Sequence, residues 1–267
     1  HGARLVAVEG LIINPANGEI SVEKFRSVGP DGEDIVIGAA RLRISLSALA
    51  SRRITIRTLS IADADIDLRL DDKGRWSVGG FPMSFARDGA KPEPESAWQL
   101  KANNISIDNS RITLAIGPTI HSAMIDRLRL DTVSTLRPNE PTTMELSAQA
   151  AGGTLKFTGK AYPFARLPRT AFAVILENID LSTLEPLIST GRIKTVRGTA
   201  ALDGRVEMGM TKFGTTISYA GIASLSDTGT DTTLFSGRAK KLLWEGSARA
   251  TYGIPDDHPG LQPDIHL

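Results

Sequence analysis

Residues 42–81 read LRISLSALASRRITIRTLSIADADIDLRLDDKGRWSVGGF and decide the fold. From residue 62 to residue 70 every second residue is apolar, and charged side chains stand between them. Because successive side chains of a strand point to opposite faces, this alternation predicts a strand with one dry face and one wet face. Asp71, Asp72 and Gly74 supply the turn chemistry that ends it.

The first half of the same stretch predicts one short helix and one further strand. Residues 45–50 have the composition of a helix of one or two turns. We expect residues 53–59 and 61–70 to form a pair of strands after it. Much of the remaining chain repeats the alternation, so the sequence predicts a β protein whose strands are dry on one side only.

Composition excludes several classes of protein. The chain has 267 residues with 31 Lys and Arg against 30 Asp and Glu, which gives a net charge of +1. A nucleic-acid-binding protein usually carries a basic excess, so we expect no nucleic acid partner. There is no cysteine, which removes disulfides, iron–sulfur clusters and thiolate zinc sites. No apolar run approaches the roughly 18 residues of a membrane-spanning helix, and no signal peptide is visible.

The chain begins at His1 rather than at Met. We therefore expect a piece of a longer protein, with any anchor outside it. The pattern predicts a first β unit over residues 1–90, a polar linker at 91–97, a second β unit over 98–254 and a loose tail at 255–267. A second helix is expected over 182–190, because Ser182 and Glu185 have the spacing of a capping box.

One strand changes the parity of its apolar residues along its length. Ile105 and Ile107 share one parity, whereas Ile112 and Ile116 share the other. A shift of one residue would turn the apolar set to the wrong face. The sequence therefore predicts a turn or a β-bulge at residues 108–110.

The expected strands far outnumber the two short helices, which cannot cover one face of so many strands. The fold class predicted is therefore mainly β, with three possible arrangements: two sheets packed face to face, a closed barrel, or a curled sheet whose apolar face stays partly open. The β-sandwich is the commonest of the three. A curled sheet would leave a large apolar surface exposed, and such a surface normally marks a binding site.

A search for catalytic chemistry yields only weak candidates. Residues 227–231, DTGTD, resemble the Asp-Thr-Gly loop of aspartic proteases, but too little chain follows for that fold, and a polar hairpin loop is the simpler interpretation. Asp63, Asp65 and Asp67 lack the glycine that a calcium loop needs after them, so they are interpreted as a solvated strand face. The four histidines are scattered. We expect no catalytic residue, no metal, no cofactor and no enzymatic activity.

Three stretches carry a resemblance to a known family. Residues 45–80 (SLSALASRRITIRTLSIADADIDLRLDDKGRWSVGG), residues 98–116 and residues 177–208 (ENIDLSTLEPLISTGRIKTVRGTAALDGRVEM) are similar to the AsmA-like superfamily of Gram-negative envelope proteins, which includes AsmA, YhdP and TamB. The shared features are a Leu-rich short helix, a strand pair, an acidic strand and a turn, here from Asp71 to Trp76.

The resemblance implies a periplasmic module that is anchored to the inner membrane in the full-length protein. It implies an elongated, curled antiparallel β-sheet with two short helices, for which the β-sandwich remains the alternative. The apolar groove of this sheet binds phospholipid or another acyl lipid and conducts it between the inner and outer membranes. Such a module supports outer-membrane homeostasis, with other envelope proteins as possible partners. A structural or partner-binding β domain for envelope assembly, without lipid transfer, remains the alternative.

The residues expected to line the groove are the apolar residues on the dry side of each strand. For each of them, the alternative is a place in a sealed core. They are Ile54, Ile56, Ala64, Ile66, Leu68, Leu70, Ile112, Leu114, Ile116, Leu128, Leu130, Met144, Leu146, Leu155, Phe157, Phe172, Val174, Leu176, Leu202, Val206 and Met208.

Overall fold

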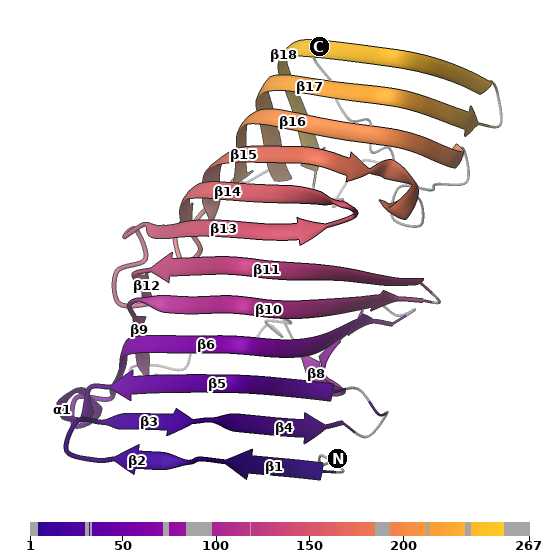
Figure 1. The fold of residues 1–267 in the computed structure, drawn as a ribbon. Helices are drawn as coiled ribbons and strands as arrows, with labels where there is room; N and C mark the ends of the chain where they lie inside the picture. Colours follow the sequence, from indigo (N-terminus) through magenta and orange to yellow (C-terminus); the bar gives the residue numbers. More distant parts are fainter. Residues whose placement is uncertain are drawn as a thin grey trace. The chain divides into compact units, whose positions relative to one another are not determined.

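The computed structural model describes residues 5–29, 32, 34–71, 75–83, 98–117, 119–184, 193–211, 214–232 and 236–253. The chain divides into two compact units, residues 1–136 (unit 1) and 137–267 (unit 2). Nearly all described residues lie in strands (Figure 1). The fold class predicted from the sequence is confirmed: the protein is mainly β, and its strands form a curled sheet that does not close on itself.

Unit 1 contains twelve described strands and one short helix. They are β1 (Leu5–Glu9), β2 (Ile12–Asn14), β3 (Glu19–Val22), β4 (Lys24–Val28), β5 (Asp34–Ile44), α1 (Leu46–Leu49), β6 (Arg53–Leu70), β7 (Trp76–Val78), β8 (Phe81–Met83), β9 (Gln99–Ala102), β10 (Ile105–Ile116), β11 (Thr119–Asp131) and β12 (Val133–Ser134). The helix α1 forms where the sequence predicts it. It is a single turn, because β6 begins only four residues after its end.

Strand β6 is the centre of unit 1. The expectation of two strands at 53–59 and 61–70 is wrong, because β6 runs unbroken for 18 residues. Strands β5 and β7 pair with it antiparallel on one side, and β9 and β10 pair with it parallel on the other. The sheet is therefore mixed rather than wholly antiparallel. The parallel pairing arises because residues 71–98 return the chain to the end of the sheet at which β6 begins.

This pairing also moves the division of the chain away from the polar segment at 91–97. That segment lies outside the described residues. Strands β9 and β10 follow it in sequence but pair with β6, which precedes it. The two compact units consequently divide after Leu136, which differs from the domains at 1–90 and 98–254 expected from the sequence.

The parity change predicted at residues 108–110 occurs in β10, but the bulge there inserts no extra residue, because β10 keeps its register with β6 and β11 on both sides of it. Asn109 has a φ of 45°, and β10 continues on both sides of it. Asp63 in β6 has a φ of 54° beside it, so the irregularity crosses two strands. Asn and Asp are the non-glycine residues that adopt the left-handed conformation most readily. Because bulges bend strands, these two residues contribute to the curl of unit 1.

Three of the buried residues of unit 1 lie next to this bulge. Ser110 is 1% exposed, Ala64 is 3% exposed and Ile125 is 7% exposed. Ser110 pairs with Ile125 across β10 and β11, and its hydroxyl accepts a hydrogen bond from the backbone N–H of Ala64 at 3.1 Å. Part of the small core of unit 1 therefore lies at this bulge, whereas Ser27, Ala102 and Ser134, which are 3–4% exposed, lie away from it.

Unit 2 is an antiparallel meander of long strands. It comprises β13 (Thr142–Ala150), β14 (Gly153–Tyr162), β15 (Arg169–Asp180), the 3₁₀ turn η1 (Leu181–Leu184), β16 (Ile193–Thr211), β17 (Gly214–Thr232) and β18 (Ser236–Gly253), each strand pairing with the next. Asn178 of β15 and Asp227 of β17 have positive φ values of 55° and 48°. Bulges at Asn and Asp thus recur in unit 2.

Two expectations for unit 2 need correction. The helix expected over 182–190 is described only as η1, and residues 185–192 lie outside the described part. Its N-terminal hydrogen-bond acceptor is Asp180 rather than Ser182: the Asp180 carboxylate accepts from the backbone N–H and the hydroxyl of Ser182, at 2.9 and 2.7 Å. These two bonds lower the pKa of Asp180.

The second correction concerns residues 227–231, which were interpreted as a hairpin loop. They belong to β17, which runs to Thr232, and Asp231 pairs with Ser236 of β18. The bulge at Asp227 accommodates the polar run inside the strand. No helix among the described residues is long and apolar enough to cross a membrane.

Candidate functional site

One face of unit 2 carries three apolar rows that cross every strand from β13 to β18. Residues paired in register on neighbouring strands point to the same face of a sheet, so the pairing defines the rows. They are Met144, Gly159, Phe172, Val206, Tyr219 and Ala248; Leu146, Phe157, Val174, Gly204, Gly221 and Gly246; and Ala148, Leu155, Leu176, Leu202, Ala223 and Trp244. Nine of the ten residues predicted for the groove in this unit lie in these rows. The tenth, Met208, pairs with Thr170 and Ile217 in the next row.

Unit 1 has shorter rows of the same kind on either side of its bulge. The predicted groove residues beyond the bulge pair as Ile66 with Ile112, Leu68 with Leu114, and Leu70 with Ile116. Those before it, Leu128 and Leu130, pair with Ile107 and Ile105. Ile54 and Ile56 stand opposite Leu100 and Ala102 of β9. Ala64 lies between the two groups, in the core at the bulge.

Sequence reasoning missed several members of these rows. Leu59 and Ile61 pair with Ile105 and Ile107, and so extend the rows of Leu130 and Leu128 onto β6. In unit 2, Leu225 and Leu242 pair with each other beyond Trp244. For Leu59 and Ile61 the available signal is the parity change at Asp63. Leu225 and Leu242 simply continue the parity of Ala223 and Trp244.

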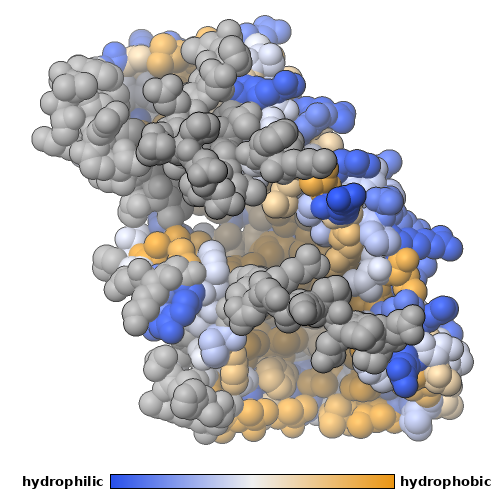
Figure 2. All heavy atoms as spheres, turned by 180° about the vertical axis from the view of Figure 1, so that it is seen from behind, coloured by the Kyte–Doolittle hydropathy of each residue, from blue (hydrophilic) through white to orange (hydrophobic). Residues whose placement is uncertain are grey.

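The apolar face is covered incompletely. Among the described residues only seven apolar side chains are at least nine-tenths buried, and four of them are alanines. The predicted groove residues are mostly half-buried, and Ile54 and Met208 are exposed. Figure 2 shows hydrophobic residues gathered on the face seen from behind, with hydrophilic residues along its margin. A sealed core would bury far more of these side chains.

Three glycines occupy neighbouring positions in the middle row of unit 2. Gly204, Gly221 and Gly246 stand side by side on β16, β17 and β18. The rings of Tyr219 and Trp244 stack on each other, with centroids 5.7 Å apart, and lie against the glycines: a Cβ on Gly204 or Gly221 would meet Tyr219, and one on Gly246 would meet Trp244. The glycine row therefore makes room for two aromatic rings on the apolar face.

The Tyr219 hydroxyl is held over this row. It lies 2.9 Å from the carbonyl oxygen of Ile222 and 3.2 Å from that of Asp203, either of which can accept its hydrogen bond. Burial, and to a smaller extent the negative charge of Asp203, raise the pKa of the Tyr219 phenol. Both effects keep the hydroxyl neutral.

A small apolar pocket of about 310 Å³ lies at the end of these rows. It is lined by Leu181 of η1, Val196 of β16, Leu225 of β17, Leu242 of β18 and the residues next to them. Its volume is at the lower end of the range of about 300–1,000 Å³ typical of ligand sites. None of the four was among the predicted groove residues, although Leu225 and Leu242 continue the parity of Ala223 and Trp244.

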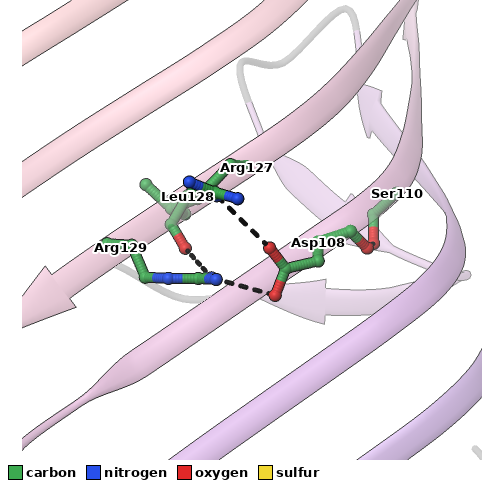
Figure 3. A network of polar contacts seen from close by, with 5 residues as sticks. All are labelled: Asp108, Ser110, Arg127, Leu128 and Arg129. Carbon is green, nitrogen blue, oxygen red and sulfur yellow. Dashed lines mark hydrogen bonds and ion pairs between the residues drawn. The ribbon is translucent and has the colours of Figure 1, made fainter.

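The opposite face of the strands is polar and ion-paired. In Figure 3, Asp108 of β10 lies between Arg127 and Arg129 of β11, at 3.9 and 2.9 Å. Asp65 pairs with Arg111 at 3.5 Å, and Arg205 with Glu207 at 2.7 Å. Exposed pairs of this kind contribute little to stability. They mark this face as solvated, as the alternation of residues 62–70 predicts.

The apolar face holds one polar side chain of note. His121 of β11 pairs with Leu114, which pairs with Leu68, and its Nε2 atom is buried without a hydrogen-bond partner within the described structure. No group of three or more His, Asp or Glu residues in the described part is placed to hold a metal ion. The arrangement offers apolar contact rather than a set of reactive groups.

Searches of protein-family models, of curated proteins and of solved structures found no match to this chain.

Proposed function

We propose that this chain is a periplasmic, AsmA-like module that binds acyl lipid on its apolar face and conducts phospholipid between the inner and outer membranes. The observation that carries the proposal is the incomplete covering of the apolar rows. Long rows of Leu, Ile, Val, Phe and Met cross each unit, yet only seven apolar side chains of the described residues are nine-tenths buried. An exposed apolar surface of this kind is typical of a binding site.

The chemistry of such a surface suits hydrocarbon. Burial of an acyl chain against it contributes about 0.8 kcal/mol per methylene group. The polar margin and the ion-paired opposite face leave a charged headgroup in water, so the headgroup need not be desolvated. Binding of this kind requires neither a covalent step nor a metal, and rows that continue from strand to strand let a chain move along them.

Lipid capture tests the proposal directly. The protein is expressed in a Gram-negative host and purified without detergent, and its bound lipid is identified by native mass spectrometry and by extraction. We expect co-purified phospholipid in the wild-type protein. Ile112→Asp places a charge on the apolar face and should remove most of it. Thr113→Asp puts the same charge on the opposite face of the same strand and should leave lipid capture unchanged.

Two results would overturn the proposal. One is a folded wild-type protein that carries no lipid and takes up none from vesicles. The other is equal lipid loss in the two variants. A protein partner recovered in place of lipid, and lost in Ile112→Asp only, would instead support the structural envelope-assembly module. Cell fractionation with a tagged full-length protein tests the periplasmic, inner-membrane-anchored location.

A further inference from the structure

Six basic residues of unit 1 lie at one end of its sheet. Strand β6 begins with Arg53 and Arg57, whereas its second half carries Asp63, Asp65 and Asp67. Residues 41–57 and 98–104 together contain no acidic side chain. They contain six basic ones, called the basic end below: Arg41, Arg43, Arg52, Arg53, Arg57 and Lys101.

Hydrogen bonds hold these segments together in space. The backbone N–H of Ser45, before α1, donates to the carbonyl of Thr55 in β6 at 2.8 Å. The backbone N–H of Gln99 in β9 donates to the carbonyl of Arg52 at 3.1 Å. The Arg53 guanidinium also donates to the Gln99 side chain at 3.3 Å. The basic end is therefore one surface, built from the end of β5, α1 and the first residues of β6 and β9.

Most of this positive charge has no ion-pair partner among the residues that the structure describes. Glu19 of β3 pairs with Arg43 at 2.6 Å and with Arg41 at 3.3 Å, and the hydrogen bond from Arg43 lowers the pKa of Glu19 and keeps it ionised. The Arg57 side chain is exposed. Among the described residues its one hydrogen-bond partner is the Ser45 hydroxyl, at 3.4 Å. One carboxylate against six cations leaves a strongly positive surface.

Exposed apolar side chains stand among these cations. Trp98, next to Gln99, is 56% exposed, Leu46 of α1 is 45% exposed and Ile54 of β6 is 36% exposed. A Trp and aliphatic side chains surrounded by Arg form the pattern of proteins that lie on a membrane surface, where the apolar groups enter the headgroup region and the cations meet anionic lipid.

The same end has a polar hollow of about 430 Å³. It is lined by Asn17, Gly18, Arg43, Ser45, Ser47 and Arg57, with their neighbours. Two arginines and two serine hydroxyls are donors that suit phosphate oxygens. A phospholipid headgroup matches the charge and the donors of this hollow.

We propose that the basic end of unit 1 docks on the surface of a bilayer that contains anionic phospholipid. The inference goes beyond the proposed function, because it assigns a role to the arginines, Leu46 and Trp98 at this end of the sheet; Ile54 alone is shared with the predicted groove. The exposed Trp98, Leu46 and Ile54 favour a membrane over a nucleic acid, whose binding would need the cations alone.

Vesicle co-sedimentation tests the docking. The whole chain is mixed with vesicles of phosphatidylglycerol and phosphatidylcholine, or of phosphatidylcholine alone, at low and high salt. We expect binding to the anionic vesicles that weakens as salt rises. Each neutralised cation should weaken binding about fivefold, which corresponds to about 1 kcal/mol per basic residue near an anionic surface. The Arg53→Gln, Arg57→Gln double variant should therefore bind about 25-fold more weakly.

The matched control is Lys156→Gln, Lys160→Gln. It removes the same net charge from exposed positions of β14 in unit 2 and should bind as the wild type does. Blue-shifted Trp emission on vesicle binding, absent in Trp98→Phe, would place Trp98 in the headgroup region. Equal weakening in the two double variants, equal binding to neutral vesicles, or a DNA duplex that competes fully with vesicles would each overturn the inference.

Failure of the docking can be told apart from failure of the proposed lipid binding. Arg53→Gln, Arg57→Gln should lose vesicle binding while it keeps co-purified lipid. Ile112→Asp should lose the lipid and keep vesicle binding.

Discussion

The side-chain amide of Asn109 donates a 2.5 Å hydrogen bond to the carboxylate of Asp63. Both residues have left-handed backbones, and they lie on the neighbouring strands β10 and β6. Gly38 of β5 stands beside them, where a Cβ would meet that of Asp63 at 2.7 Å. The irregularity is thus shared by three strands, which is expected of a feature that bends the sheet rather than of an isolated defect.

The left-handed backbone at Asn109 predicts a strong dependence on residue type. Asn109→Gly should change the free energy of unfolding little, because glycine adopts a positive φ readily. Asn109→Val should destabilise unit 1 by about 1–3 kcal/mol, because a β-branched side chain is strained in that conformation. Urea denaturation measures both. Thr113→Val, in the same strand with regular backbone, is the control and should be close to neutral. Equal effects of Val at the two positions would contradict the role given to the bulge.

Removal of the Ser110 hydroxyl is expected to lower the free energy of unfolding at the same bulge. Its hydroxyl donates to the carbonyl of Asp108 at 2.8 Å and accepts from the N–H of Ala64 at 3.1 Å. Ser110→Ala leaves both buried backbone groups without this partner and should lower the free energy of unfolding by about 1–3 kcal/mol. Ser122→Ala, at an exposed site of β11, should lower it by less than about 0.5 kcal/mol. A loss at Ser110 no larger than at Ser122 would show that water replaces the hydroxyl.

The alternation of the sequence predicts the fold class well for a physical reason. Period-two alternation fixes which side of each strand is dry, and it needs no knowledge of the partner strand. The dry side of a strand can also be assigned beyond a bulge where a parity change at Asn or Asp marks it, as at Asn109. At Asp63 the same change was overlooked, and Leu59 and Ile61 were left out of the predicted groove as a result.

Other features depend on contacts that are distant in sequence. The parallel pairing of β6 with β10 joins residues about 46 positions apart, and no local pattern specifies it. The basic end likewise combines Arg57 with Lys101 and Trp98 through the pairing of β6 and β9. Each basic pair appears isolated in the sequence, and only the sheet brings them to one surface.

The glycine row predicts that Gly→Ala within it changes the packing of the fold, whereas Gly→Ala at an open position does not. A Cβ on Gly204 would lie 2.5 Å from the carbonyl oxygen of Ala220 and 2.6 Å from the Tyr219 ring, whereas one on Gly237 would meet nothing within 4 Å. Gly204→Ala should therefore displace the ring or the strand. We expect a lower urea midpoint and a changed near-ultraviolet circular dichroism signal, because Tyr219 stacks on Trp244. Gly237→Ala should leave both unchanged, and a Gly204→Ala protein with wild-type signals would contradict the packing described.

The Tyr219 phenol predicts a loss of stability at alkaline pH. Its pKa in the folded protein is raised above the ordinary value of a tyrosine, by burial and then by the charge of Asp203. The unfolded chain therefore releases the phenol proton at a lower pH than the folded protein does. The stabilisation is fully present below about pH 10, and it is lost as the pH rises from there through the folded pKa, because ionisation then favours the unfolded chain.

Tyr219→Phe separates this effect from the other ionisations of the chain. The variant should lose about 0.5–1.5 kcal/mol at pH 8, where the hydroxyl still donates its hydrogen bond to the backbone. The difference between wild type and variant should shrink when the urea midpoints are measured at pH 10.5. A difference that stays constant from pH 8 to pH 10.5 would show that the Tyr219 phenol has an ordinary pKa and that its surroundings in the fold do not favour the neutral form.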